Sequence, residues 1–368
     1  MRLTLEPDQE FFRETTAKFL TQYAPSDAVR RLRDDAAGFA PDYWRSGVEL
    51  GWTALLVDEH MGGGSISGNG LADLTLVAHE FGRHAAPGPL LPTNIVAAAL
   101  SRYGGDGHAE VLAKLLTGDA VASWALAEPS PDRFDAVTLD VRVDGADVVL
   151  NGVKRPVESA GQATHLLVVG RTGDGLTHVI TPTDAAGVSI SPLQTLDLTR
   201  RFSAVSFDEV RVPRSSVLGE IGGGGQDVEW LLQRALVILA AESVGAMERA
   251  FELTLEWAFD RYSFGRPLAS YQELKHRFAD MKTWLEAGHA ITDAAATAVE
   301  SGTPESARLA SAAKAYVGDY GAELIQDCVQ IHGGIGLTFD HDVHLYLRRH
   351  AVDRMLFGTP TDHRLRIT

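Results

Sequence analysis

The sequence of 368 residues contains a single cysteine, Cys328. One cysteine excludes an intramolecular disulfide, and its place within an apolar helical run is more typical of a core residue than of a nucleophile. Chains without disulfides are typical of reducing compartments. We therefore expect a cytoplasmic protein whose cysteine is buried.

Positive charge is also scarce. The chain has 33 Lys and Arg against 49 Asp and Glu, which gives a formal net charge of −16. A polyanion would meet net repulsion from such a surface except at local basic patches. This excludes broad binding to nucleic acid or to an anionic membrane, and any anionic ligand must find a basic patch.

A secretory leader and a membrane span are not expected either. Glu6 and Asp8 lie where a signal peptide needs an apolar run, and by eye no stretch approaches the roughly 20 apolar residues of a membrane span. Hydrophobic residues make up 45% of the chain and charged residues 22%, as in soluble globular proteins. The length allows two or three domains.

Helical periodicity dominates the first part of the chain, from about residue 7 to 118. Glycine and proline at 62–64 and 87–89 interrupt it as loops, and the alanine-rich run 94–100 continues it. The first helix is expected to present one apolar face, made of Phe11, Phe12, Thr15, Phe19 and Leu20.

Between about 119 and 218 the pattern changes to alternation and short β-branched runs, at 137–143, 148–150, 165–169 and 204–212. Asp144-Gly145 and Asn151-Gly152 are dipeptides typical of hairpin turns. The sequence therefore predicts a small antiparallel β domain.

Long helical periods resume at 226–259, 271–300 and 304–331. Four glycines precede them at 222–225, and we interpret this run as a hinge because no G-K-[ST] follows to make a phosphate loop. The expected fold class is α+β, with a helical domain at 1–118, a β domain at 119–218 and a helical bundle at 219–368.

Three motifs carry a resemblance to a known family. The segment 261–281 reads R-Y-S-F-G-R-P-L-A-S-Y-Q-E-L-K-H-R-F-A-D-M and resembles the acyl-CoA dehydrogenase pattern R-x-x-F-G-x-x-[LI]-x-x-x-Q followed by A-D-M. The segments 330–336, Q-I-H-G-G-I-G, and 201–213, R-F-S-A-V-S-F-D-E-V-R-V-P, resemble two further patterns of that superfamily. The resemblance spans nearly the whole chain and implies a helical domain, a middle β barrel and a C-terminal four-helix bundle.

The resemblance implies FAD as the cofactor. Arg261 can meet a pyrophosphate with paired charge-assisted hydrogen bonds, although a lone arginine at a helix end more often pairs with a neighbour such as Asp260 or with the helix dipole. Gln330 can donate and accept hydrogen bonds, and glycine lets a nucleotide approach the backbone closely. Taken alone, the glycines would fit a turn that ends a helix.

In this family the residues that match these motifs largely contact the FAD that is held mainly by the neighbouring subunit. The resemblance therefore implies an obligate oligomer, usually a tetramer arranged as a dimer of dimers. The implied cofactor-binding residues are Arg261, Ser263, Phe264, Leu268, Tyr271, Gln330, Gly333, Gly334 and Thr359.

The catalytic base of the family has no counterpart at either usual place. Its reaction removes a proton from the α-carbon while the β-hydrogen leaves as hydride, and a buried glutamate with a raised pKa suits the first task. Many members place this glutamate directly before Gly-Thr, where this chain has Phe357. Others place it about ten residues before the glycine that matches Gly245, where this chain has Ala235, preceded by Gln233 and Arg234.

Glu242 is the remaining candidate for a base, because it follows the apolar run 236–241, where an unpaired carboxylate would be costly. The structural alternative is a buried ion pair or an interface hydrogen bond, with Arg234 and Arg249 as the candidate partners.

Contacts to the flavin ring are also missing. Glu128 matches the family's T-E-P segment, but the threonine before it is replaced by Ala127. The W-[IT]-[TS] strand that packs on the flavin reads Arg155, Pro156, Val157 and Glu158. Proline cannot donate a ladder hydrogen bond, and neither Pro156 nor Glu158 supplies an aromatic wall.

The chain thus lacks the base and the flavin-ring contacts but keeps the nucleotide-binding motifs. This combination resembles the non-catalytic subunit of heteromeric acyl-CoA dehydrogenases from actinobacterial steroid side-chain β-oxidation. The leading hypothesis is therefore a degenerate chain in an α2β2 heterotetramer: it helps to bind FAD in a homologous partner that supplies the glutamate, with an acyl-CoA as substrate and an electron-transfer acceptor. Two alternatives stay open. One is a self-sufficient homotetramer using Glu242 or another carboxylate, and the other is a structural or acyl-CoA-binding pseudoenzyme without redox chemistry.

Two further expectations concern the C-terminal region. His332, His341 and His344 have no convincing cysteine or carboxylate ligand set, so we expect solvated or packing histidines and no metal. The chain ends ten residues after Gly358, where many relatives continue into another helix, so we expect a partner to supply a capping contact.

Overall fold

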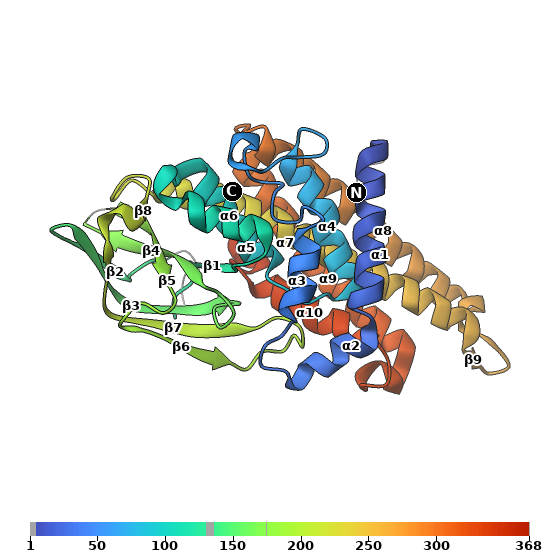
Figure 1. The fold of residues 1–368 in the computed structure, drawn as a ribbon. Helices are drawn as coiled ribbons and strands as arrows, with labels where there is room; N and C mark the ends of the chain where they lie inside the picture. The colour runs from blue at the N-terminus through green and yellow to red at the C-terminus, as the bar shows by residue number, and fades with distance from the viewer. Residues whose placement is uncertain (1–4, 130–135, 174, 368) are drawn as a thin grey trace.

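The computed structural model describes residues 5–129, 136–173 and 175–367. Helices come first, then strands, then helices again, and this order confirms the α+β fold class expected from the sequence. In Figure 1 the sheet forms one end of the molecule, and a pair of long helices projects from the opposite end. Residues 1–4 and 368, which belong to the expected N- and C-terminal domains, lie outside the described residues.

The N-terminal helices form a layer against the C-terminal helices. They are α1 (Pro7–Tyr23), α2 (Ser26–Arg31), α3 (Pro41–Val48), α4 (Gly70–His84), α5 (Leu90–Tyr103) and α6 (Ala109–Thr117). The buried face of α1 is made of Gln9, Phe12, Thr16 and Leu20. Phe11 is 72% exposed, so its expected place on that face was wrong. Neighbouring residues point about 100° apart around a helix, and only one of the two phenylalanines can face the core.

The β region is one mixed sheet. Its strands are β1 (Ala122–Ala125), β2 (Asp140–Asp144), β3 (Asp147–Glu158), β4 (His165–Thr172), β5 (Gly175–Pro182), β6 (Val188–Leu193), β7 (Phe202–Pro213) and β8 (Val217–Leu218). The strand order is β6-β7-β3-β2-β4-β5-β8, with β1 paired to β4. Most pairs are antiparallel as expected, but β4 runs parallel to β1 and to β2.

The two expected hairpin turns have different outcomes. Asp144-Gly145 lies at the turn between β2 and β3, as predicted. Asn151-Gly152 lies inside β3 instead, where the register with β7 shifts between Leu150 and Gly152. Gly152 has φ of 141°, and a Cβ there would lie 3.1 Å from Leu139. The Asn-Gly pair thus marks a β-bulge, because glycine fits both the backbone angle and the close packing.

The C-terminal region consists of α7 (Gly225–Asp260), α8 (Gln272–Glu300), α9 (Ser306–His332), α10 (Val343–Met355) and α11 (Pro360–Ile367). The three long helical periods in the sequence correspond to α7, α8 and α9 to within two residues. The last helix, α11, packs on α9, and its His363 lies 2.9 Å from the Phe357 carbonyl oxygen. The described residues therefore include a helix after Thr359, and a capping contact from a partner stays a prediction.

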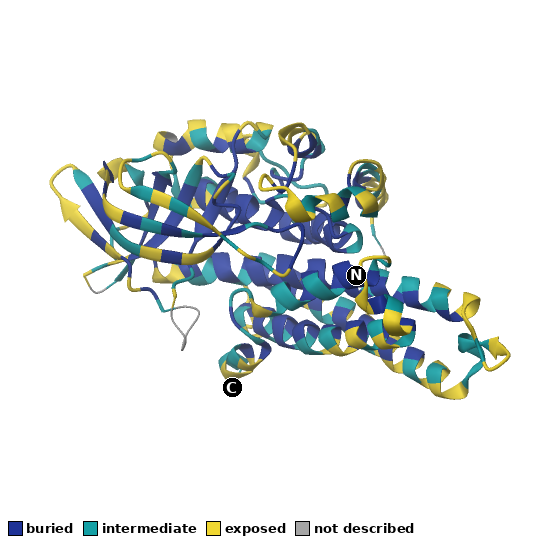
Figure 2. Cartoon of the chain, turned by 90° about the horizontal axis from the view of Figure 1, so that it is seen from below, coloured by how far each residue is buried: buried dark blue, intermediate teal, exposed yellow. Residues whose placement is uncertain are grey.

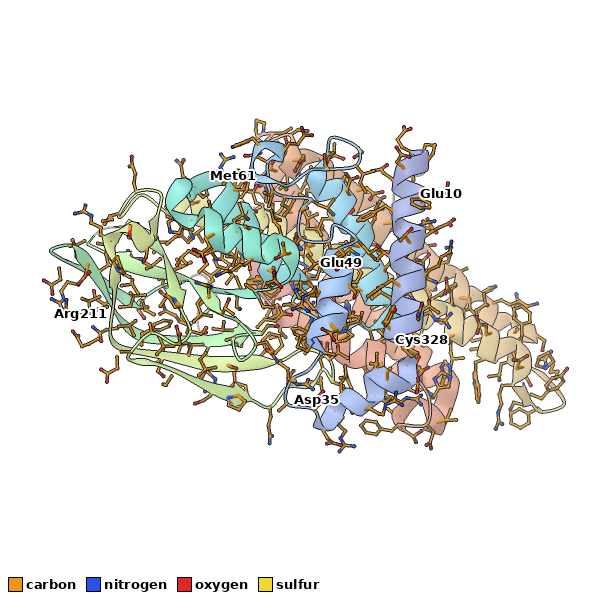
Figure 3. The ribbon with its side chains drawn as sticks, viewed as in Figure 1. Glu10, Asp35, Glu49, Met61, Arg211 and Cys328 are labelled. Atoms are coloured by element: carbon orange, nitrogen blue, oxygen red, sulfur yellow. The ribbon has the colours of Figure 1, made fainter. Side chains whose placement is uncertain are left out.

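The helix α7 is long and apolar enough to cross a membrane by length and composition, which corrects the impression that no such stretch exists. However, 89% of its most apolar window is buried inside the protein, as in the core helix of a soluble protein. Cys328 of α9 lies in the same helical core (Figure 3), where burial raises the pKa of its thiol to about 12. The expectation of a buried core cysteine is confirmed.

The glycine run before α7 is tied to the sheet. Gly222 donates its N–H to Thr177 Oγ1 at 2.9 Å, and Gly224 donates to the Leu176 carbonyl at 2.8 Å. The connection between the sheet and α7 is thus held by β5, rather than being a loose hinge.

Candidate functional site

The helix pair α7 and α8 ends in an arm that projects from the body of the molecule (Figure 1). We call "the arm" the end of α7, the short strands β9 (Tyr262–Ser263) and β10 (Arg266–Pro267), the turn Leu268–Ser270 and the start of α8. Figure 2 shows that this end is mostly exposed or half-buried. Phe264 at its tip is 98% exposed, and Tyr262 and Phe259 are more than half exposed. A large apolar surface of this kind is typical of an interaction site.

The arm brings the expected residues of the first motif together. The Leu268 N–H donates to the Arg261 carbonyl at 2.9 Å, and the Tyr271 hydroxyl donates to the Ser263 carbonyl at 2.7 Å. The Arg266 guanidinium lies 3.8 Å from the centre of the Tyr271 ring. These contacts fix the backbone of the hairpin while leaving the Arg261 side chain at the surface.

The second motif lies beside the first through a stacked pair of rings. Trp257 of α7 and His332 of α9 stack with ring centres 5.3 Å apart, and the Arg261 guanidinium lies 5.9 Å from the Trp257 ring. His332 also packs on His341 at 4.2 Å, in line with the packing role expected for these histidines. The sequence analysis missed Trp257, although its position one helical turn before Arg261 was a usable signal.

The segment 330–336 offers open space for a ligand. Gln330, Gly333 and Gly334 are exposed, and Gly333 has φ of 67°, where glycine is favoured. A Cβ on Gly334 would meet nothing within 4 Å, whereas one on Gly336 would lie 2.8 Å from the Val329 carbonyl. The first two glycines thus leave the backbone uncovered, and Gly336 is required by packing against α9.

The Arg261 guanidinium makes no hydrogen bond or ion pair within the described residues, so the expected alternative of a pair with Asp260 is not formed there. Together, an unpaired guanidinium, the exposed Gln330 amide and the open space beside Gly333 and Gly334 match what a pyrophosphate and an adenosine require. The residues present on this surface fit the nucleotide end of FAD.

A second region, the Phe357 cavity, lies between the sheet and the C-terminal helices. It has a volume of about 190 Å³. It is lined by Leu91, Pro92, Trp124, Ala127, Glu128, Arg155, Pro156, Glu158, Phe202, Met355, Leu356 and Phe357. The rings of Trp124 and Phe357 lie 5.4 Å apart. Ligand sites usually enclose about 300 Å³ or more, so the cavity within this chain alone is small for a flavin ring together with a substrate.

Glu128 in this cavity is fully engaged by the chain itself. It accepts hydrogen bonds from the Thr138 N–H at 2.8 Å, from the Thr138 hydroxyl at 2.5 Å and from the Leu139 N–H at 2.9 Å. Lys154, which is fully buried, donates to it at 2.6 Å. Burial alone would raise the pKa of Glu128, but Lys154 and these hydrogen bonds hold it below its ordinary value.

Pro156 interrupts the ladder at the expected place. The pairing of β3 with β7 skips from Lys154 to Val157, because proline has no N–H to donate. Next to it, buried Glu158 lies 3.3 Å from Arg200, and burial raises its pKa. The cavity wall thus carries a proline and a paired carboxyl group.

Glu242 lies in a buried ion-pair cluster. Arg200 donates to it at 2.5 Å, and Arg349 donates to its other oxygen. The expected alternative of a buried ion pair is therefore formed, but with Arg200 and Arg349 instead of Arg234 or Arg249. Arg234 lies over Trp230, with its guanidinium 3.4 Å from the ring centre. The pairing partners come from distant segments, so spacing along α7 did not reveal them.

The same cluster links three parts of the fold. Asp197 and Arg200 precede β7, Glu242 belongs to α7, and Arg349 belongs to α10 and donates to Asp197 at 2.5 Å. Burial opposes the charge of Asp197, but Arg349 and Arg200 hold its pKa below the ordinary value. Both carboxylate oxygens of Glu242 are bound by buried guanidiniums from other segments, so the cluster suits a structural role for Glu242.

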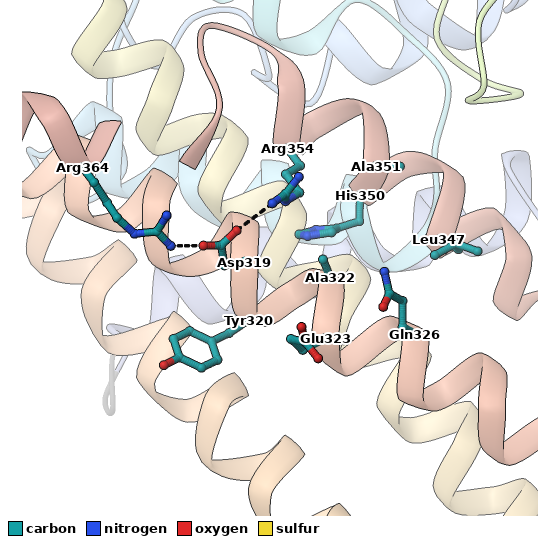
Figure 4. Close-up of a pocket in the computed structure, with 10 residues that line it drawn as sticks. All are labelled: Asp319, Tyr320, Ala322, Glu323, Gln326, Leu347, His350, Ala351, Arg354 and Arg364. Atoms are coloured by element: carbon teal, nitrogen blue, oxygen red, sulfur yellow. Dashed lines mark hydrogen bonds and ion pairs between the residues drawn. The ribbon is translucent and has the colours of Figure 1, made fainter. Parts of the chain in front are cut away.

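Two further features involve the C-terminal helices. Thr359, expected to contact the cofactor, caps α11: its N–H and its hydroxyl both donate to Asp362 at 2.7 Å. A cavity of about 610 Å³ between α9, α10 and α11 contains none of the expected site residues. Figure 4 shows Arg354 and Arg364 converging on Asp319 there. Its basic groups are thus paired within the chain.

Comparisons with known proteins agree with the geometry. A family model described as acyl-CoA dehydrogenase, N-terminal domain, matches residues 6–119, and one described as acyl-CoA dehydrogenase, C-terminal domain, matches residues 222–368. The chain is 31% identical over 362 residues to acyl-CoA dehydrogenase IpdE2 of Mycobacterium tuberculosis, covering 98% of this chain and 96% of that protein. It is 29% identical over 366 residues to IpdE2 of Mycolicibacterium smegmatis, covering 99% and 98%.

Two solved structures have the same fold. A variant of the Tcur3481-Tcur3483 steroid ACAD superposes with a TM-score of 0.90 at 26% identity, covering 99% of this chain and 97% of that one. Butyryl-CoA dehydrogenase from Megasphaera elsdenii also gives a TM-score of 0.90, at 23% identity, covering 100% and 98%. The second likeness supports the fold alone.

Proposed function

The chain belongs to the acyl-CoA dehydrogenase family, and from this premise we propose that it is the base-lacking subunit of a heteromeric acyl-CoA dehydrogenase. Members of this family are oxidoreductases that use FAD and act on acyl-CoA thioesters. The observation that carries the proposal is a contrast. The arm offers open, unpaired groups for a nucleotide, whereas the Phe357 cavity is small and its two carboxyl groups, Glu128 and Glu158, are paired within the chain.

In the assembled enzyme, FAD supplies the acceptor for the hydride that leaves the β-carbon of the acyl thioester. This chain contributes to binding and not to proton removal. Arg261 would hold the pyrophosphate of FAD, Gln330 would hydrogen-bond its adenosine end, and Gly333 and Gly334 would let the nucleotide approach the backbone. Ser263, Phe264, Leu268 and Tyr271 shape the arm that reaches the partner.

The homologous partner supplies the glutamate that removes the α-proton, and an electron-transfer acceptor removes the electrons. We propose a cytoplasmic α2β2 heterotetramer. The likeness to the Tcur3481-Tcur3483 steroid ACAD supports a steroid-derived acyl-CoA as the substrate class.

Co-expression with the chain encoded beside this one tests the proposal. We expect an equimolar complex with one FAD per pair of chains, measured by native mass and flavin absorbance, and acyl-CoA-dependent flavin reduction only in the complex. A homogeneous preparation of this chain alone, with one FAD per subunit and normal turnover, would overturn it. A complex that assembles without any FAD would favour the pseudoenzyme alternative.

A further inference from the structure

Three ligand-type side chains from three helices meet far from the flavin surface. His79 of α4, Glu248 of α7 and His289 of α8 each offer a ligand atom, and these atoms all lie within 4.8 Å of one another. His79 Nε2 lies 2.8 Å from Glu248 Oε2, and His289 Nε2 lies 3.9 Å from Glu248 Oε1. They face a cavity of about 620 Å³ whose other wall is α1.

His79 is the second observation that points to a ligand. It is only 3% exposed, and neither of its ring nitrogens makes a hydrogen bond within the described residues, despite the short approach to Glu248. A buried polar group without a partner is costly and rare in native proteins. Nearby buried Gln9 and Asp73, by contrast, are hydrogen-bonded to each other at 2.7 Å. A bound ion would give a ring nitrogen of His79 a directed partner, whereas its approaches to Glu248 at 2.8 Å and to Glu80 at 3.6 Å lack hydrogen-bond alignment.

The surroundings favour a cation. Five glutamates and two arginines line the cavity, and they are Glu14, Glu80, Glu248, Glu252, Glu286, Arg13 and Arg83. Arg83 is bound by Glu252 at 2.8 Å and approaches the Oε2 atom of Glu248 at 3.0 Å. The Oε1 atom of Glu248 is the one that faces His289. A negative cavity of this kind raises the local concentration of cations.

We propose that His79, Glu248 and His289 form a site for one divalent transition-metal ion of the zinc class. Zinc prefers imidazole nitrogen and carboxylate oxygen at about 2.0–2.2 Å, which places tetrahedral ligands roughly 3.4 Å apart. The observed separations of 2.8 and 3.9 Å lie on either side of that value. Glu80 Oε1 lies 3.6 Å from His79 Nδ1, as in the carboxylate–histidine–metal arrangement that orients a ligand.

The ion would clamp α4 to α7 and α8, which joins the N-terminal helices to the C-terminal bundle. Glu248 lies within α7, and Arg261 is the residue directly after this helix. They are 13 positions apart, which corresponds to about 20 Å along the helix axis. The site is therefore structural and separate from flavin chemistry, and it does not depend on the proposed function.

Cobalt titration tests the site, because tetrahedral Co²⁺ absorbs visible light. The chain, together with any partner that co-purifies, is stripped with a chelator and titrated with Co²⁺, followed by Zn²⁺ as competitor. We expect one Co²⁺ per chain, displacement by Zn²⁺ but not by Ca²⁺, and at least about tenfold weaker binding by His289→Gln. His276→Gln changes an exposed histidine on the same helix and should bind Co²⁺ as the unaltered protein does.

Glu248→Gln serves as a second variant, with far-UV circular dichroism to verify that each variant is folded, and it should weaken Co²⁺ binding to a similar degree. Absence of saturable Co²⁺ binding at millimolar concentration would overturn the proposal. So would equal binding by both folded variants and the unaltered protein, or displacement of Co²⁺ by Ca²⁺ as readily as by Zn²⁺.

Discussion

On the arm, the guanidinium of Arg261 has no hydrogen-bond partner within the described residues, whereas in the Phe357 cavity the carboxylate of Glu128 has four hydrogen bonds. The arm exposes its aromatic tip, with Phe264 98% exposed, while the cavity packs Phe357 against Trp124. We propose that both regions correspond to the flavin site of the family, and the carboxyl groups of the cavity are paired by this chain's own residues while Arg261 is not.

The difference indicates which region needs a partner. Polar groups that are satisfied inside a chain add to its own stability, and polar groups left open at a protruding surface are available for a ligand or another subunit. The interior region should therefore respond to mutation through folding, and the arm through assembly and cofactor binding. Four predictions test this contrast.

The largest effect is expected inside the protein, at Glu242. Glu242→Ala leaves the buried guanidiniums of Arg200 and Arg349 without one of their carboxylates, and it should lower the free energy of unfolding by about 3–5 kcal/mol. Urea denaturation of the isolated chain measures this. As a control on the same helix, Glu256→Ala removes a mostly exposed carboxylate and should change stability by less than about 1 kcal/mol. Similar stabilities for the two variants would contradict the structural role of the cluster.

Glu242→Gln in the assembled enzyme addresses the alternative in which Glu242 is the catalytic base. If this variant folds and binds FAD but no longer reduces it with acyl-CoA, Glu242 is the base and the contrast between the two regions fails. We expect flavin reduction to persist, because the partner supplies the base.

The next largest effect is a pH dependence of the free energy of unfolding that arises from Lys154. Burial lowers its pKa from an ordinary value of 10.5 to about 8, although Glu128 acts in the opposite direction. Between these pH values the unfolded chain holds a proton that the folded chain has lost. The free energy of unfolding should therefore rise with pH across this window, by up to about 3 kcal/mol.

The double variant Lys154→Met/Glu128→Gln removes the buried ammonium without leaving a charged partner behind. Its stability curve should lack the rise attributed to Lys154 when urea denaturation is compared from pH 7.5 to 10.5. Parallel curves for the variant and the unaltered chain would show that the Lys154 ammonium is not held in a desolvated site.

Arg261→Lys should weaken FAD binding in the complex by about 2 kcal/mol, roughly 30-fold, because lysine cannot form the paired hydrogen bonds of a guanidinium. The isolated chain should keep its stability, since Arg261 makes only a distant ring contact. Arg308→Lys, at an exposed arginine paired with Glu305, provides the control. Equilibrium flavin release measures the effect, and equal FAD affinities for both variants would remove Arg261 from the site.

The smallest effect on folding is expected at the tip of the arm. Phe264→Ala should change the stability of the isolated chain by less than about 0.5 kcal/mol, because the ring is almost fully exposed. The same change should weaken assembly with the partner, measured by sedimentation at increasing dilution. A loss of stability in the isolated chain, without any effect on assembly, would contradict the role of the arm in assembly.

Local patterns predicted the parts of the fold that depend on local forces. The ends of α7, α8 and α9 follow the apolar period closely, and the turn at Asp144-Gly145 forms as its residue types require. The Asn151-Gly152 bulge was misread as a turn, because the same glycine conformation serves both structures and only the pairing of β3 with β7 distinguishes them. The parallel pairing of β1 with β4 joins segments about 40 residues apart and left no local signal.

The candidate site likewise has one part that local sequence predicts and another part that depends on how the helices pack. The motif around Arg261 is contiguous and was found from sequence, but Trp257 and His332, which join it to the Gln330 loop, meet only through the packing of α7 on α9. The ion pairs of Glu242 with Arg200 and Arg349 and the cluster of His79, Glu248 and His289 are likewise products of helix packing.

The sequence by itself determined the family, the α, β, α order and the motifs at Arg261 and Gln330, because these properties depend on residue type and short spacing. It also predicts that Phe357 stands in place of a catalytic glutamate. Only the tertiary structure decided which charges are paired. Glu128 with Lys154 and Glu242 with its two arginines are fixed by contacts between distant segments, while Arg261 has no such contact within the described residues. The cost of burying a charge depends on what surrounds it in space, and that neighbourhood exists only after folding.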